Sequence, residues 1–495
     1  MPDATKRRSF TVGTDLRTAR SIHALTLGDI AENNARRFGD ATAVEDEDSV
    51  WTHAGLAQQA GELAAGLAAR GVARGDVVAW TGGNSAWLPV ALLAAGRLGA
   101  ALAPLHAKST DAEREDQLAQ LGPRVVLDGP GAAAALCDGR TPPEDQALED
   151  EPVLVIGTGA FDGRQRWAQL THRGLILQSL LLSARDQLSP REVYLASGPL
   201  AHVGTFQYVL AHWLVGARTV VLPRMEPKQF AELVDRLGVT GAYLVPASVP
   251  QIVAAAEERG LKLSTLRTPA LSGSEILDRW TAMTSRPVWA GESLGTSTGY
   301  GQTEVTGLVT SVALGTGAPV GNVGWPQHVA PVRVVRPGTL EEADPGEVGE
   351  VVVRGPLVMA GYRGDDMTRR WEGGWHHTTD LGVREADGSL SFAGTSTNMV
   401  KSGGENVYPA EVERILLGHE GVRAVCVVGV EDAQWGSRIA AAVAGEVTEA
   451  ALEEFARERL ASHKRPRLWE VVDELPKSAG RVDRAAVAKL FTNGG

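Results

Sequence analysis

Cysteine is almost absent from this chain, and the two that occur, Cys137 and Cys426, lie far apart. A disulfide framework or a cysteine-based metal site needs several cysteines at close spacing, so both are excluded as organising features. Low cysteine usage fits a reducing compartment, and we expect a cytoplasmic protein.

Positive charge is also in deficit. The formal net charge is −12, and short basic groups such as Lys464-Arg465 do not extend into a basic stripe. Proteins that bind nucleic acid need clustered lysine and arginine to displace counterions from phosphates. We therefore expect no nucleic-acid partner.

Long apolar runs are missing as well. The most membrane-like stretch, residues 86–105, is interrupted by Pro89, Arg97 and Gly99, whereas a membrane-spanning helix needs about 20 apolar residues. We interpret it as a buried helix followed by a turn. Residues 9–15 offer no apolar core for a secretory signal. We expect no membrane span.

The chain is long, and alanine and glycine are abundant in it. Its 495 residues exceed the ~250–300 residues at which one hydrophobic core stops growing, so more than one unit is expected. Fractions of 43% hydrophobic and 22% charged residues are typical of a folded globular protein.

The first two thirds of the chain alternate between helical and strand-like patterns. Apolar residues recur at helical spacing over residues 25–70, as in "LAQQAGELAAGLAARG", where Gly71 is a stop signal. Short apolar runs closed by Gly, Pro or Ser follow, among them "DVVAWTGG", "PRVVLDG", "PVLVIGTG", "EVYLASGPL", "ARTVVLP" and "GAYLVPAS". This alternation predicts an α/β fold with largely parallel sheets.

After residue 331 the pattern changes. The segments "PVRVVRPG", "GEVGEVVVRG" and "GSLSFAG" are separated by turn residues and predict antiparallel strands. The last hundred or so residues alternate strands and helices and are long enough for a small α+β domain. We place the boundary near residues 394–398, giving a large domain of residues 1–394 and a small one of residues 395–495.

The segment "STGYGQTEV", residues 297–305, is the first candidate for chemistry. Glycine lets the backbone approach a flat ligand, and Tyr300 can stack on an aromatic ring. Thr303 can donate to an anionic oxygen, and Glu304 can hold a hard cation. These abilities suit a nucleotide phosphate with magnesium; a polar turn after a strand is the alternative interpretation.

Other motifs that could carry chemistry occur along the chain. They are "PLAHVGT" (199–205), "ALSGSEIL" (270–277), "YGQTE" (300–304), "GEVGEVVVRGPLVMAGY" (346–362), "GGWHHTTDLG" (373–382) and "SGGENVYPAEVE" (402–413). With these motifs the chain resembles the adenylate-forming acid ligases, which include the acyl-CoA synthetases. The resemblance implies a large body of stacked mixed sheets with helices and a small β-barrel-like part, followed by a mobile α+β C-terminal lid.

The resemblance also implies residue roles. Asp380 would grip both ribose hydroxyls, since a carboxylate accepts two hydrogen bonds. The residues implied in binding ATP or AMP are Thr158, Gly163, Gly273, Ser274, Glu275, Tyr300, Gly301, Gln302 and Asp380. The residues implied in catalysis are Thr303, Glu304, His202, Lys401 and Arg481, with Glu304 as the Mg²⁺ ligand.

The resemblance also implies which residues bind the substrates. The residues assigned to the acyl and thiol substrates are His202, Phe206, Gly295, Gly403 and Gly404. His202 would gate the carboxylate end of the acyl pocket, although a lone histidine is often a packing residue. Gly403 and Gly404 would keep the backbone narrow beside an entering thiol, and a tight turn before a helix at Pro409 explains them equally.

Three departures from the family affect the phosphate end of the nucleotide. In the expected phosphate loop "TGAFDGRQRW" (158–167), Phe161 and Asp162 replace hydroxyl residues, while Arg164 and Arg166 could supply positive charge. Residues 394–398 lack the family's arginine and its charged hinge. Arg481 stands where the family has a catalytic lysine, and its planar, bulkier group is not equivalent.

Three functions are therefore open. The first is an AMP-forming ligase that activates a small carboxylic acid with ATP and passes the acyl group to coenzyme A. The second is a relative with altered chemistry, which forms amides or uses a preformed adenylate or thioester, so that a carrier thiol or an amine is the acceptor. The third is a non-catalytic nucleotide- or acyl-binding protein. We expect a monomer or homodimer.

Overall fold

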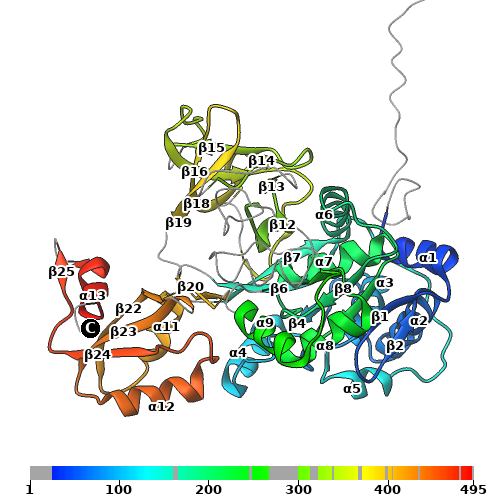
Figure 1. The fold of residues 1–495 in the computed structure, drawn as a ribbon, viewed down its shortest axis with the longest axis horizontal. Coiled ribbons are helices and arrows are strands. Elements are labelled where there is room, and N and C mark those ends of the chain that lie inside the picture. Colours follow the sequence, from blue (N-terminus) through cyan, green and yellow to red (C-terminus); the bar gives the residue numbers. More distant parts are fainter. Residues whose placement is uncertain are drawn as a thin grey trace, which may run out of the picture.

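The computed structural model describes most of the chain. The described residues are 25–159, 165–242, 244, 248–266, 299–312, 322–336, 339–365, 371–395, 400–403, 405–407, 409–432, 435–478 and 481–492. Figure 1 shows three regions: a large α/β body, an antiparallel sheet above it, and the C-terminal unit beside it.

Two sheets form the body. The first has the order β17-β7-β6-β4-β3-β5. Its strands are β3 (Val77–Trp80), β4 (Ala101–Pro104), β5 (Val125–Leu127), β6 (Pro152–Gly159), β7 (Gln165–Thr171) and β17 (Gly361–Tyr362). Strands β3, β4, β5 and β6 pair in parallel, and β6 and β7 form an antiparallel hairpin. The expected parallel strands are confirmed in this sheet.

The second sheet has the order β10-β8-β9-β1-β2. Its strands are β1 (Thr42–Glu45), β2 (Val50–Thr52), β8 (Val193–Ala196), β9 (Arg218–Val221) and β10 (Gly241–Ala242). The first two lie inside residues 25–70, where the sequence indicated only helical spacing. Strand β1 pairs with β9, more than 170 residues later, so its local sequence alone does not specify it.

Helices fill the space between the two sheets and cover their outer faces. Side chains from both sheets form one core with α1 (Leu27–Phe38), α2 (His53–Ala69), α3 (Trp87–Arg97), α6 (His172–Arg185) and α7 (Val203–Leu214). The outer face of the first sheet packs on α4 (Asp111–Leu121). The outer face of the second packs on α8 (Pro227–Leu237) and α9 (Val249–Arg259).

Alternation along the strands explains this layering. In β3, Val78 and Trp80 join the central core, whereas Val77 and Ala79 join the cluster under α4. Successive side chains of a strand point to opposite faces, so a strand that is apolar throughout must be covered on both sides. The short helix α5 (Pro130–Ala134) follows β5 at the sheet edge.

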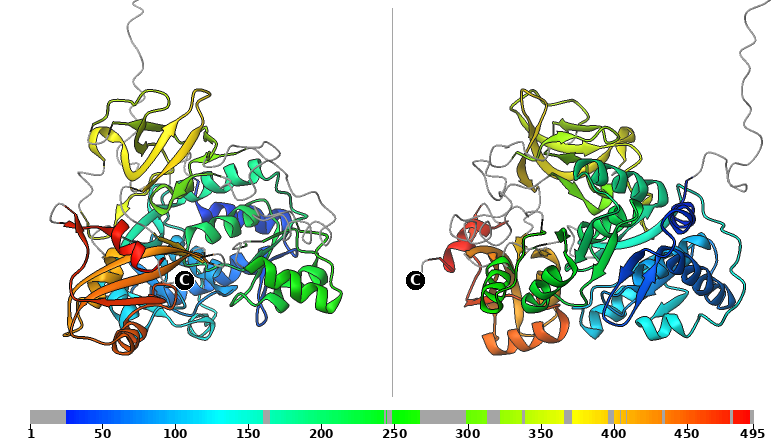
Figure 2. Two further views of the ribbon diagram at one scale, coloured as in Figure 1. Left: turned by 60° about the vertical axis from the view of Figure 1, so that its left-hand side comes forward. Right: turned by 45° about the vertical axis from the view of Figure 1, so that its right-hand side comes forward.

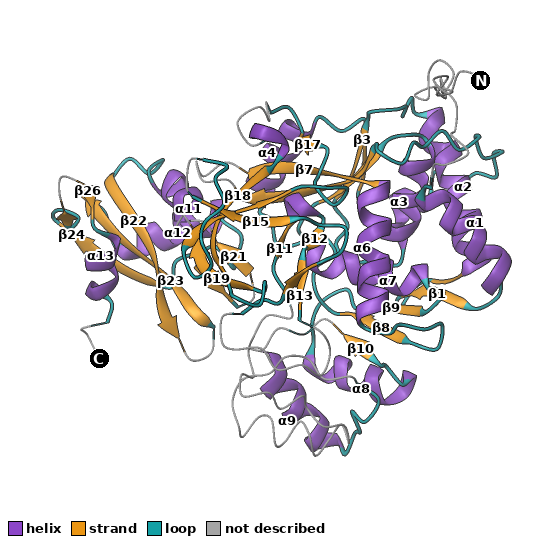
Figure 3. Cartoon of the chain, turned by 90° about the horizontal axis from the view of Figure 1, so that it is seen from above, coloured by secondary structure: helices purple, strands orange, loops and turns teal. Residues whose placement is uncertain are grey.

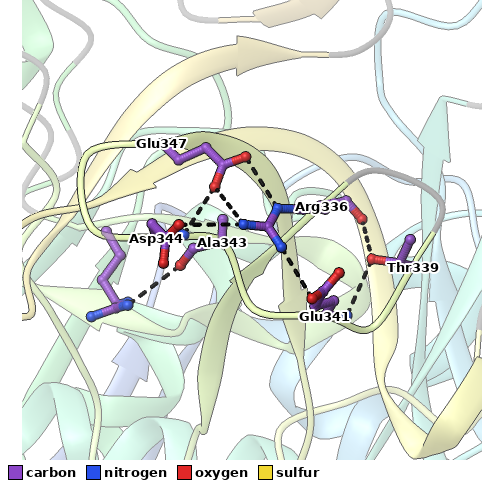
Figure 4. Close-up of polar contacts among 7 residues, drawn as sticks. Arg336, Thr339, Glu341, Ala343, Asp344 and Glu347 are labelled. Carbon is purple, nitrogen blue, oxygen red and sulfur yellow. Dashed lines mark hydrogen bonds and ion pairs between the residues drawn. The ribbon is translucent and has the colours of Figure 1, made fainter.

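An antiparallel sheet follows, as predicted. It has the order β15-β16-β18-β19, with strands β15 (Val332–Val335), β16 (Val348–Val353), β18 (His376–Arg384) and β19 (Leu390–Thr395). In the loop between β15 and β16, Arg336 pairs with Glu341 at 3.1 Å and with Asp344 and Glu347 at 3.3 Å (Figure 4). Such exposed pairs shape a loop and add little stability.

Short elements connect this sheet to the body. They are the hairpin of β11 (Gly301–Gln302) and β12 (Gly307–Leu308), the 3₁₀ turns Thr303–Val305 and Glu372–Gly374, and the pair of β13 (Thr310–Ser311) and β14 (Trp325–Pro326). The 3₁₀ turn Thr303–Val305 lies within the β11–β12 hairpin and packs beside β7, so it lies where the antiparallel part meets the body.

The C-terminal unit has its own cores. Its central strands are β22 (Val422–Asp432), β23 (Gly436–Gly445) and β24 (Leu468–Val472), with helices α11 (Pro409–Leu416), α12 (Glu449–Arg459) and α13 (Arg484–Leu490). The hairpins β20 (Val400–Ser402)–β21 (Glu405–Val407) and β25 (Lys477–Ser478)–β26 (Arg481–Val482) complete it. Apolar clusters cover both sheet faces. The boundary at residues 394–395 stays a prediction.

Figures 2 and 3 show this unit, which carries β22 to β24, beside the body rather than threaded through it. Residues 86–105 form the buried helix α3, followed by strand β4. None of the helices in the described part of the chain is long and apolar enough to cross a membrane.

Candidate functional site

The polar segment at residues 299–305 forms a tight hairpin. Gly301 pairs with Leu308, and a Cβ added to Gly301 would lie 1.7 Å from the carbonyl oxygen of Gly307. The glycine is therefore required by the opposite strand, which is a different reason from the close approach of a ligand expected from the sequence. The hairpin holds Tyr300, Thr303 and Glu304 on one short turn.

Asp380 lies beside this hairpin. Its Oδ2 accepts hydrogen bonds from the Tyr300 hydroxyl, at 2.8 Å, and from the Gln302 amide. Burial raises the pKa of Asp380, and this outweighs the lowering by the hydrogen bonds from Tyr300 and Gln302. The preceding residue, Thr379, has φ of 64°, a left-handed conformation that is rare for a β-branched residue. Such strain is often found at ligand sites.

Tyr300 has a structural position as well as a candidate role. Its ring is 6% exposed and stacks on Phe392 with centroids 6.0 Å apart. Burial, followed by the charge of Asp380, raises the pKa of the Tyr300 hydroxyl well above its usual range, so it remains a donor to that carboxylate. Its predicted stacking on an aromatic ligand stays a prediction.

Two hydroxyl groups hold the Glu304 carboxylate. Its Oε1 accepts from the Tyr362 hydroxyl at 2.6 Å and from Thr158 Oγ1 at 3.3 Å. Tyr362 comes from β17 and Thr158 from β6, so two strands of the first sheet fix the carboxylate. Glu304 is only 8% exposed. A buried carboxylate with a fixed orientation is a suitable ligand for a hard cation.

These residues fit a nucleotide and a divalent cation. Both hydrogen bonds to Asp380 reach Oδ2, and both to Glu304 reach Oε1, so one oxygen of each has no hydrogen bond from the described residues. One free oxygen can accept from a sugar hydroxyl and the other can bind a cation. Arg166, at the end of the expected phosphate loop, pairs with Asp365 at 3.5 Å and stacks on Tyr362.

A second cluster lies where the C-terminal unit meets the body. His202 Nε2 lies 2.7 Å from Glu405 Oε2, and His106 Nε2 lies 3.5 Å from Glu405 Oε1. Lys108 Nζ is 3.9 Å from the same oxygen, and the ring of His463 is 5.2 Å from that of His106. His106 follows β4 and His202 precedes α7, whereas Glu405 and His463 belong to the C-terminal unit.

Burial shifts the pKa values of the titratable groups in this cluster. It lowers the pKa of His106 below 6.5 and that of His463 to about 3. Burial alone would raise the pKa of Glu405, but the contacts from His106 and His202 outweigh it and lower that pKa well below its usual range. An ionised carboxylate is thus enclosed by imidazoles.

The neighbouring glycine loop is as tight as expected. Gly403 has φ of 58°, and an added Cβ would lie 2.7 Å from Trp435 Cε3. The Gly403 N–H donates to the Trp435 carbonyl at 3.0 Å. Lys401, on β20, is exposed. Gly403 is therefore fixed by an aromatic side chain next to Glu405.

The structure does not bring every predicted residue together. Phe206 is 1% exposed and packs in the central core, so a contact with the acyl group stays a prediction. Arg481 begins β26, on the hairpin at the far end of the C-terminal unit from the body (Figure 3). The predicted residues outside the described part are Gly163, Gly273, Ser274, Glu275, Gly295 and Gly404, as are Phe161, Asp162, Arg164 and Asn398 of the departures.

Sequence reasoning missed three residues. Tyr362 ends the quoted segment 346–362, so its place in a motif was a usable signal. His106 and His463 belong to no motif, and only the fold brings them within ring contact at 5.2 Å.

Comparison with known proteins assigns the family. The sequence profile described as "AMP-binding enzyme" matches residues 31–363, and the profile "AMP-binding enzyme C-terminal domain" matches residues 411–480. The chain belongs to the AMP-binding enzyme family. The resemblance to adenylate-forming acid ligases is thereby confirmed.

Two curated relatives are similar over nearly the whole chain. A feruloyl-CoA synthase from Amycolatopsis sp is 32% identical over 94% of this chain and 99% of its own length. A 2-succinylbenzoate–CoA ligase from Geobacillus kaustophilus is 30% identical over 89% of this chain and 92% of its own. This chain is an enzyme of the AMP-dependent acid–CoA ligase type.

One solved relative appears in two forms. The fold matches a double mutant of o-succinylbenzoate CoA synthetase from Bacillus subtilis with its product analogue OSB-NCoA, with a TM-score of 0.80, 24% identity, and coverage of 93% and 98% of the two chains. The same enzyme with the acyl-adenylate OSB-AMP gives 0.63, at 23% identity and coverage of 92% and 97%. The arrangement here is closer to the first form.

Proposed function

We propose that this ligase activates an aromatic carboxylic acid with ATP, forms the acyl-adenylate, and transfers the acyl group to coenzyme A. The observation that carries this proposal is the paired arrangement of the two clusters. Asp380 and Glu304 are set to hold a nucleotide, while Glu405 of the C-terminal unit reaches His202 on the body. The names of both curated relatives contain aromatic acids, which supports the substrate class.

Each residue role is part of the same proposal. Asp380 holds the ribose, and Thr303 with the hairpin backbone stabilises charge on the α-phosphate. Glu304 holds Mg²⁺, which when bound neutralises phosphate charge. Thr158 orients Glu304, and Gly403 leaves room beside Glu405 for a thiol. Lys401 and Arg481 supply positive charge.

The better match to the product-analogue complex supports coenzyme A as the acceptor. In this chain Glu405, which follows the glycine loop, contacts His202 of the body. The amide-forming and non-catalytic alternatives are not favoured by the relatives, both of which are named for CoA thioester formation.

The test measures both half-reactions with a panel of acids. We expect pyrophosphate release from ATP that depends on an aromatic acid, and a thioester detected by mass spectrometry when coenzyme A is added. Fatty acids of similar mass are the control for substrate class, and amines replace coenzyme A as the control for the acceptor. Pyrophosphate release without any thioester would overturn the acceptor assignment.

A further inference from the structure

The cluster of His106, His202 and Glu405 could be interpreted as a metal site, because one ligand atom from each lies within 4.8 Å of the others. The hydrogen bonding of His106 argues against this. Its Nδ1 accepts the backbone N–H of Lys108 at 3.1 Å. A backbone N–H only donates, so Nδ1 is the unprotonated nitrogen and Nε2, which faces Glu405, carries the proton. A metal would need the opposite tautomer.

The same reasoning fixes the tautomer of His202. Its Nε2 lies 2.7 Å from Glu405 Oε2, and an ionised carboxylate only accepts hydrogen bonds. The Nε2 proton therefore points at Glu405, so in the neutral form of the ring the lone pair is on Nδ1. The His202 side chain is 42% exposed, so a substrate has access to the ring. A carboxylate that orients an imidazole in this way makes it a better base.

We infer that His202 is the base that removes the proton from the incoming thiol, and that it is assembled only when the C-terminal unit brings Glu405 onto it. Glu405 is a positioning residue, and His106 positions Glu405 through its second oxygen. The inference rests on the proposed function, because it assigns the base for the thioester-forming step.

The step balances as follows. The thiol proton moves to His202 Nδ1, and the sulfur attacks the carbonyl carbon of the acyl-adenylate. The carbon–sulfur bond forms as the carbon–oxygen bond to the phosphate breaks, and AMP leaves with the electron pair. The imidazolium, stabilised by Glu405, then releases its proton to water.

The position of Glu405 makes assembly of the base depend on the C-terminal unit. His106 and His202 belong to the body, whereas Glu405 arrives on β21 of the C-terminal unit. The chain matches the two forms of its solved relative with different TM-scores, 0.80 and 0.63, which indicates that the parts of this fold take different arrangements. When Glu405 is absent, the His202 ring loses its partner and its fixed tautomer.

The other charged or titratable groups around Glu405 come from three elements. They are Lys108 after β4, His463 and Lys464 after α12, and Glu113 of α4. Lys464 pairs with Glu113 at 3.7 Å. Lys108 contacts the Glu405 oxygen that His106 also faces.

The test follows single-turnover thioester formation from a preformed aryl-adenylate and coenzyme A, over pH 6 to 10, in His202→Asn and Glu405→Gln. A general base contributes about 10²- to 10⁴-fold, so we expect a loss of that size at pH 7 in His202→Asn. The loss should shrink as pH rises past ~8.5, where a thiol ionises by itself. A merely structural defect would not recover with pH.

Two controls separate the outcomes. The exposed residues His328 and Glu420 provide the matched substitutions His328→Asn and Glu420→Gln, which should behave as wild type. A loss that is equal at every pH, or one equivalent of zinc in the purified wild type that disappears in His202→Asn, would overturn the inference. Failure of the proposed function has a different signature, namely no pyrophosphate or thioester from the wild type.

His106 is tested by a variant that keeps a donor. His106→Gln offers an amide N–H to Glu405, so we expect a smaller loss than in His106→Leu, again at pH 7 and with recovery at high pH. Equal, pH-independent losses in both variants would show that His106 acts only through packing and would remove it from the inference.

Discussion

At the scale of single residues, the site depends on buried carboxylates with one oxygen occupied. Asp380 and Glu304 are 9% and 8% exposed, and each is held by hydroxyl or amide donors. Fixing one oxygen orients the other toward a ligand without cost at the moment of binding. The affinity for nucleotide should therefore be sensitive to substitutions that conserve shape.

We predict that Asp380→Asn weakens AMP binding roughly 10- to 150-fold, because a hydrogen bond to a charged group is worth about 1.5–3 kcal/mol. Calorimetry with AMP measures the change, and Asp473→Asn, at an exposed aspartate, is the matched control. Equal affinity of Asp380→Asn and wild type would place the ribose elsewhere.

Glycine at position 403 offers a second prediction at this scale. Gly403 and Gly436 both have positive φ, 58° and 72°, but an added Cβ meets Trp435 at 2.7 Å in the first and nothing within 4 Å in the second. Alanine at either position costs about 1–2 kcal/mol of backbone strain.

We therefore expect backbone strain to lower the free energy of unfolding by similar amounts in Gly403→Ala and Gly436→Ala, as measured by urea unfolding. Gly403→Ala should lose more, because its added methyl group meets Trp435. Thioester formation should slow only in Gly403→Ala, because the displaced loop carries Glu405. A slow thioester step in both variants would contradict this.

At the scale of elements, α4 has two tasks. Its Thr110 and Glu113 form a capping box at the helix start. The other Glu113 oxygen accepts the backbone N–H of Ala461 at 3.0 Å and lies 3.7 Å from Lys464. One carboxylate thus caps a helix of the body and holds the C-terminal unit. Helix α1 has a capping box of the same kind, with Thr26 and Asp29, within the body.

We predict that Glu113→Ala and Asp29→Ala each cost about 0.5–1.5 kcal/mol, the net worth of a typical hydrogen bond, measured by urea unfolding. Glu113→Ala should also lower the thioester-forming rate, because the C-terminal unit loses two contacts with the body. If Asp29→Ala lowered that rate equally, the effect would belong to general stability rather than to the interface.

At the scale of the whole molecule, the interface between the body and the C-terminal unit is polar and rich in histidine. Burial there lowers the pKa of His106 and lowers that of His463 from 6.5 to about 3. A base whose pKa is lower in the closed arrangement binds more protons when the units separate. The contribution of these two histidines to the stability of the closed arrangement is therefore fully present above pH 6.5 and is lost as pH falls toward 3.

We predict that the closed population falls between pH 7 and pH 5, measured by energy transfer between dyes on the body and on the C-terminal unit. His463→Gln cannot gain a proton there and should flatten the dependence, whereas His328→Gln, at an exposed position, should not. A closed population that is constant over this range would contradict the prediction. The core histidine His172, whose pKa burial lowers to about 3, affects global unfolding instead.

Local patterns were enough for most of the parallel strands of the body. Strands β3, β6, β8 and β9 are apolar runs closed by turn residues, and their burial on both faces is why they can be found without neighbours. Glu304 was proposed from the glycine and polar residues of its own segment, whereas Asp380 was proposed only through the resemblance of its motif to the family.

Other features were decided only by tertiary structure. Strand β1 exists because β9 pairs with it, and the partners of Glu405 come from parts of the chain some 200 to 300 residues away. Hydrogen bonds and desolvation act through space, so no spacing along the chain specifies which imidazole meets which carboxylate. The sequence alone determined a layered α/β ligase of the acid–CoA type; the packing of the two units decided that Glu405 meets His106 and His202.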